Sequence, residues 1–201
     1  MTDTSRWAVL SGIAGLVANA LLVLFFALSR PWTGQWSEYA WLGSVNDAVI
    51  VVQFGALVPV ALAVRAVLGG RVTGVTAAAV TAMVAVMVLQ SALLTGLLTF
   101  DVQVWAVVVC FVVVFGWVLA VSRAGRDVLA PAAVRVGTVC AVGFLAGIAV
   151  AGLGALVPEG PGRYAVWGVG GLAGLCAWLV FPVWTLALAR RVPARAEAVA
   201  G

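Results

Sequence analysis

The sequence contains no histidine and no lysine, and it has few cysteines. The absence of histidine excludes imidazole acid–base catalysis, a Ser–His triad and histidine-ligated metal sites. The absence of lysine excludes a Schiff base. Cys110, Cys140 and Cys176 lie far apart within apolar runs and form no C-x-x-C pair, so we expect buried small side chains and no metal site. No phosphate-binding G-x-x-x-x-G-K-[ST] loop occurs either, and no cofactor is expected.

Charged residues are scarce as well. They make up 9% of the 201 residues, whereas 65% are hydrophobic and the mean hydropathy is +1.19. A soluble domain is about 45–50% apolar and about 25% charged, so this composition excludes a soluble globular domain and a disordered chain. The net charge of +4 is dispersed over eleven arginines, which argues against nucleic acid as a partner. The composition predicts an all-α integral, multi-pass protein of a bacterial cell membrane, with the lipid bilayer as its surroundings.

Six apolar runs are long enough to cross a bilayer, because a hydrocarbon core of about 30 Å needs about 20 helical residues. Backbone groups in lipid must be satisfied within the segment, so each run is predicted to be a helix. The runs are 7–28, 45–64, 75–100, 104–121, 136–157 and 164–189. No connection is long enough for a second domain. We therefore predict one bundle of six transmembrane helices over residues 1–201, with residues 190–201 as a short basic tail.

The arginines predict the orientation of this bundle. With six spans, one side of the membrane would hold nine of the eleven arginines, and the other side only Arg30 and Arg163. Positive residues favour the cytoplasmic side, so both termini are predicted to be cytoplasmic. Small residues recur at every fourth position in two of the runs, from Gly143 to Ala155 and at Gly170 and Gly174. This spacing predicts close helix packing, and it favours contacts within the bundle over a dimer surface.

Polar residues within the apolar runs mark a candidate site. Asn46 and Gln53 share one face of the second run, and Gln90 lies within the third. Such amides either hydrogen-bond between helices or line a ligand cavity. Four of the seven acids fall at the predicted outer end, where most of the Trp and Tyr residues also gather. The candidate ligand-binding residues are Asn46, Asp47, Gln53, Gln90, Asp101, Trp41 and Trp105. For Asp47 a second interpretation is open, since Ser44-Val45-Asn46-Asp47 matches a capping box at a helix start.

Three functions from different classes fit these features. The first is binding or transport of a small amphiphilic or cationic molecule at an outward-facing, acidic and aromatic-rich site. The second is an intramembrane isoprenoid (terpene-type) cyclase, in which Asp47 and Asp101 would be the catalytic acids. The third is a non-catalytic structural or regulatory partner of another membrane protein. Whether the protein is an enzyme stays open in the sequence.

Overall fold

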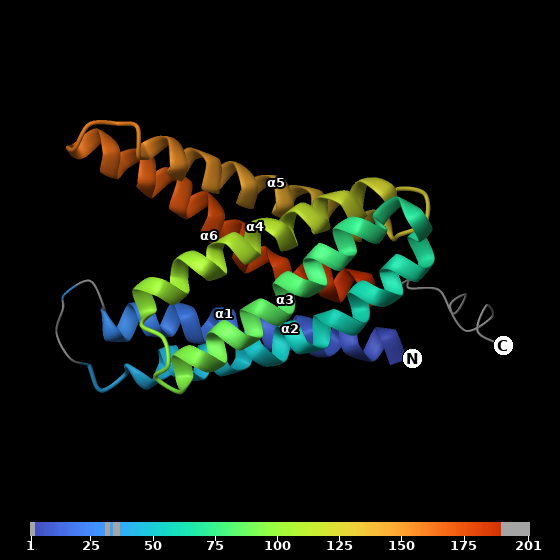
Figure 1. The fold of residues 1–201 in the computed structure, drawn as a ribbon, viewed down its shortest axis with the longest axis horizontal. Helices are drawn as coiled ribbons and strands as arrows, with labels where there is room; N and C mark the ends of the chain where they lie inside the picture. Colours follow the sequence, from blue (N-terminus) through green and yellow to red (C-terminus); the bar gives the residue numbers. More distant parts are fainter. Residues whose placement is uncertain (1–2, 31–32, 34–36, 190–201) are drawn as a thin grey trace.

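The computed structural model describes residues 3–30, 33 and 37–189, and within these ranges the chain forms helices and turns but no strand. Its α-helices and the short 3-10 helix η2 follow one another along the chain (Figure 1). They are α1 (Asp3–Ser29), α2 (Trp41–Leu68), η2 (Gly69–Val72), α3 (Thr73–Leu94), α4 (Phe100–Ala124), α5 (Pro131–Gly154) and α6 (Pro161–Ala189).

Five helical segments of the described chain are long and apolar enough to cross a membrane. Four of them are α1, α4, α5 and α6, and the fifth is the continuous helical stretch Trp41–Leu94. This stretch reverses direction at η2, so that α2 and α3 lie side by side and pack against each other (Figure 1). The fold class is therefore that of an all-α membrane protein.

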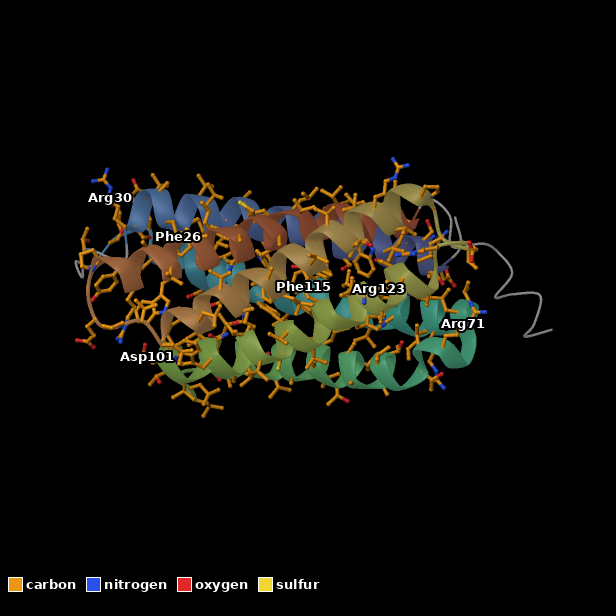
Figure 2. All side chains as sticks on the ribbon, turned by 90° about the horizontal axis from the view of Figure 1, so that it is seen from above. Phe26, Arg30, Arg71, Asp101, Phe115 and Arg123 are labelled. Atoms are coloured by element: carbon orange, nitrogen blue, oxygen red, sulfur yellow. The ribbon has the colours of Figure 1, made fainter. Side chains whose placement is uncertain are left out.

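The helices form a closed ring. Each α-helix packs against its neighbour in the chain, and α6 packs against α1 to complete the circle. The N-terminal end of α1, the η2 turn and the α4–α5 connection lie at one end of the bundle (Figure 1). Arg71 and Arg123 mark this end, and Arg30 and Asp101 mark the opposite end (Figure 2). We call them the Arg71 end and the Asp101 end.

The helix bounds correct two details of the expectations above. The capping-box interpretation of Ser44 and Asp47 is wrong, because α2 begins at Trp41 and Ala40 is its N-cap residue. Ser44 therefore lies one turn inside the helix, where the backbone amides already have helical partners. The predicted run 75–100 is too long, since α3 ends at Leu94 and residues 95–99 form a turn before α4. The predicted basic tail 190–201 lies outside the described residues.

Aromatic rings fill the middle of the ring of helices. Phe115 stacks on Phe144 with ring centroids 4.1 Å apart, and Phe111 stacks on Trp178 at 4.5 Å. The column continues toward the Arg71 end through Phe54, Phe181, Trp184 and Trp117. Offset and edge-to-face ring pairs of this kind add about 0.5–1.5 kcal/mol each beyond the area they bury. The column therefore closes the bundle in its middle and at its Arg71 end.

The helices α5 and α6 approach each other more closely than side chains would allow. A Cβ atom on Gly147 would lie 2.6 Å from the backbone nitrogen of Gly174, and one on Gly170 would lie 2.6 Å from the backbone nitrogen of Ala151. In lipid, where apolar side chains gain nothing by leaving the solvent, such backbone contact is a main source of helix association. The small-residue spacing thus serves contact within one chain.

This geometry predicts the effect of a single methyl group. We expect Gly170→Ala to destabilise the protein by about 1–3 kcal/mol, because backbone on α5 cannot move aside as a side chain would. Gly168→Ala is the matched control on the same helix, since its Cβ would meet nothing within 4 Å. Denaturant titration in mixed micelles measures both changes. Equal stabilities for the two variants would contradict the close α5–α6 contact.

Candidate ligand-binding cavity

A cavity of about 320 Å³ lies inside the ring of helices, and all six α-helices contribute to its lining. It occupies the half of the bundle toward the Asp101 end, above the aromatic column. At this end the α5–α6 hairpin leans away from the other helices (Figure 1). Phe100, Gly171 and Leu175 line the cavity and are themselves exposed, so they mark its opening. The volume is at the lower end of the range of about 300–1,000 Å³ for small-molecule sites.

Four polar side chains line one side of the cavity, and we call them the polar wall: Asn46, Asp47, Gln90 and Gln103. They come from α2, α3 and α4. The Gln103 Nε2 donates a hydrogen bond of 2.8 Å to the Gln90 Oε1, and both residues are buried. This bond joins α3 to α4 just after the turn between them. Among the described residues the Gln90 Nε2 and the Gln103 Oε1 have no further partner, so the pair keeps one donor group and one acceptor group unused; exchanging O and N in both amides together leaves the same balance.

Asn46 and Asp47 bring an unpaired acceptor and a charge to the polar wall. The side chain of Asn46 is 6% exposed, and its Oδ1 has no hydrogen-bond partner in the described part of the chain. Asp47 follows Asn46 directly on α2 and also lines the cavity. Asp47 is half-buried and takes part in neither of the two ion pairs found among the described residues. The Asp47 side chain therefore borders the cavity without a cation, and next to it on α2 lies a buried amide oxygen that has no partner among the described residues.

The remaining surface of the cavity is apolar. Phe111, Phe144 and Trp178 form its floor at the top of the aromatic column. Phe111 lies two turns beyond Gln103 on α4, which places the floor roughly 12 Å below the polar wall at a rise of about 1.5 Å per residue. The facing side is α6, where Gly174 is buried and a Cβ on it would meet nothing within 4 Å. Gly174 thus leaves open space where a side chain would stand.

The structure brings together three of the seven residues predicted for the site. Asn46, Asp47 and Gln90 line the cavity, whereas Asp101 is exposed and lies outside its lining. Trp41 and Trp105 are 57% and 73% exposed and also lie outside it. Two further tryptophans of the predicted outer end, Trp32 and Trp36, lie outside the described residues.

Gln53 occupies a different place from the other amides. It is 1% exposed and packs where α1 meets α2 and α6, with its Nε2 only 2.7 Å from where a Cβ on Gly15 would be. Neither of its polar side-chain atoms has a partner in the described part of the chain. One turn of α1 away, the Asn19 Nδ2 donates a 2.9 Å hydrogen bond to the Leu179 carbonyl oxygen, shortly before Pro182 in α6. These amides belong to helix packing and not to the cavity.

Sequence reasoning missed Gln103, although it carries half of the hydrogen bond in the polar wall. The residue falls between the predicted runs 75–100 and 104–121, and therefore in a predicted connection. A signal was present: Thr99 and Asp101 are residue types that favour the start of a helix, and a start there places Gln103 inside the helix. The aromatic floor was also missed, because its rings come from three helices that are far apart in sequence.

Comparisons with family models, with curated proteins and with solved structures give no match for this chain. The class of the protein therefore follows from its fold and composition. It is an all-helical, polytopic membrane protein with an aromatic cluster between its helices.

The Gln90–Gln103 bond leads to a prediction about stability. We expect Gln103→Leu to cost about 1–2 kcal/mol, because it leaves a buried amide on Gln90 without its partner. The double variant with Gln90→Leu should cost less than this single change, since no orphaned amide remains. A double-mutant cycle by denaturant unfolding in micelles measures the coupling, which averages about 0.6 kcal/mol and reaches about 1.7 for interhelical bonds in membranes. Strictly additive costs would contradict the bond.

Proposed function

We propose that the protein binds one small amphiphilic molecule in the cavity toward the Asp101 end, as a binding or transport component. The observation that carries this proposal is the combination of a polar wall with an apolar floor in one cavity. A ligand with a polar head and an apolar body would satisfy both surfaces. Binding sites of this kind are mostly apolar, with a few polar groups that set the orientation of the ligand.

The proposed topology has six spans, with both termini in the cytoplasm of a bacterial cell. It takes α2 and α3 as separate spans joined by η2, which agrees with their antiparallel packing in the ring. The Arg71 end carries Arg6 near the start of α1, Arg65 in the last turn of α2, and Arg71, Arg123, Arg126 and Arg135. Arginine-rich ends face the cytoplasm. The cavity would then open toward the outer leaflet.

The two other functions draw less support from the geometry. A cyclase with two catalytic acids would need both of them near the substrate, and Asp101 is exposed outside the cavity lining. A protein that serves only as a partner of another membrane protein has no need of an internal cavity. An empty cavity in a helix bundle costs stability through the contacts that are lost, so a cavity kept for a ligand explains that cost.

Reporter fusions test the topology. We expect cytoplasmic reporter activity for fusions after Gly70 and Gly125, and activity on the outer side for fusions after Gly96 and Gly162. The reason is that the first two sites adjoin the arginine-rich connections, whereas Gly96 lies in the turn before α4 and Gly162 in the first turn of α6, both at the Asp101 end. A reversed pattern would place the cavity on the cytoplasmic side. Fusions after Gly70 and Gly96 on the same side would overturn the six spans.

Filling the cavity tests the binding proposal. We expect Gly174→Leu to abolish ligand binding while the protein stays folded, because the new side chain enters open space inside the cavity. Gly168→Leu is the matched control, since Gly168 is exposed and lies outside the lining. A brominated decanol, which quenches tryptophan fluorescence on contact, reports binding next to Trp178. Saturable quenching should be present in the wild type and the control and absent in Gly174→Leu. Quenching that is equal in all three proteins would refute the proposed site.

A further inference from the structure

The polar wall distinguishes between ligand heads of different charge. Arginine is the only basic side chain in this sequence, and no arginine is among the described residues that line the cavity. The wall instead holds one carboxylate and three amides. An anionic head, such as a phosphate or a carboxylate, would therefore face Asp47 without any compensating cation. Burying a charge without a partner is costly.

Hydrogen-bonding capacity narrows the choice among heads that are not anionic. The Asn46 Oδ1 is buried and has no partner in the described part of the chain. Its neighbour Asp47 accepts hydrogen bonds only, when ionised. The Gln90–Gln103 pair keeps one acceptor and one donor unused. Acceptors thus outnumber donors on the wall, and a buried acceptor without a donor costs about 1–3 kcal/mol.

From this balance we propose that the ligand is a single-chain amphiphile whose head is a protonated primary amine. This inference rests on the proposed function and adds the chemistry of the head. An ammonium group has three N–H donors and a positive charge. It pairs with the Asp47 carboxylate and donates to the Asn46 oxygen and to the free acceptor of the glutamine pair. The apolar chain extends past Gly174 to the aromatic floor.

A quaternary ammonium head fits the wall less well, although it has the same charge. It carries no N–H group, so the Asn46 oxygen and the free glutamine acceptor would both stay unpaired. Its usual recognition depends on aromatic rings around the cation. The rings of Phe111 and Trp178 stack at the floor and not around Asp47. Charge alone therefore does not define the preferred head.

Four probes with the same ten-carbon chain test the proposal: decylamine, decyltrimethylammonium, decanol and decanoate. Binding to the purified protein in a non-ionic detergent is measured by native mass spectrometry and by the shift in unfolding temperature with probe concentration. We expect decylamine to bind at least tenfold more tightly than each of the other three. Gly174→Leu should abolish the binding of all four probes. This variant therefore distinguishes binding in the cavity from partitioning of the probes into the detergent.

Variants of the wall identify the groups that recognise the head. Asp47→Asn should remove the preference for decylamine over decanol, and Asn46→Leu should reduce the preference for decylamine over decyltrimethylammonium. Glu38→Gln is the control, because Glu38 is an exposed acid outside the cavity lining. It should leave all affinities unchanged.

The other possible results overturn either the proposed head group or the proposed binding site. If decyltrimethylammonium, decanol or decanoate binds as tightly as decylamine, and Gly174→Leu still blocks the probes, the primary-amine head is refuted and the cavity site stands. If no probe binds, or if Gly174→Leu changes nothing, the proposed function fails together with the head.

Discussion

The backbone contact between α5 and α6 is the constraint on which the rest of the structure depends. Because Gly147 and Gly170 carry no side chains, the two helices meet backbone to backbone and form a closely packed hairpin. The hairpin packs against α4 and α1 but leans away from them at the Asp101 end (Figure 1). A more loosely joined pair could collapse onto the other helices. The cavity lies toward this end, and both helices of the hairpin contribute to its lining.

The two ends of the ring differ in what fills them. Toward the Arg71 end, aromatic rings occupy the axis, and the Ser5 hydroxyl of α1 donates a hydrogen bond to the Ala189 carbonyl oxygen of α6. Near the middle of α1, the Asn19 amide adds a second bond to α6. Toward the Asp101 end, α2, α3 and α4 turn amides and an acid inward, and α6 presents glycines. The bundle is thus closed by packing at one end, and at the other it offers a surface that only a ligand or water can complete.

Individual residues show how far the sequence alone could lead. Asn46, Asp47 and Gln90 could be selected because polar groups in apolar helices face the interior whatever the topology. Asp101 and Trp105 are also predicted to lie at the outer end of the bundle. Their position at that end does not show whether their side chains point into the bundle or away from it. Gln103 was missed because a helix start within an apolar run leaves little composition change. Gln53 shares a helix face with Asn46, yet it packs against α1 and α6 instead.

The sequence by itself determined the class of the protein, its helical segments and the concentration of its arginines at one end of the bundle. These follow from hydropathy and from the need of every backbone group in lipid to be paired within its own helix. Only the tertiary structure decided which faces of the helices meet. It placed Gln103 against Gln90, left the Asn46 oxygen unpaired and kept open space above Gly174. In a chain that is 65% hydrophobic, nearly every face is apolar, so hydropathy cannot distinguish the lipid side from the inner side and close packing must decide it.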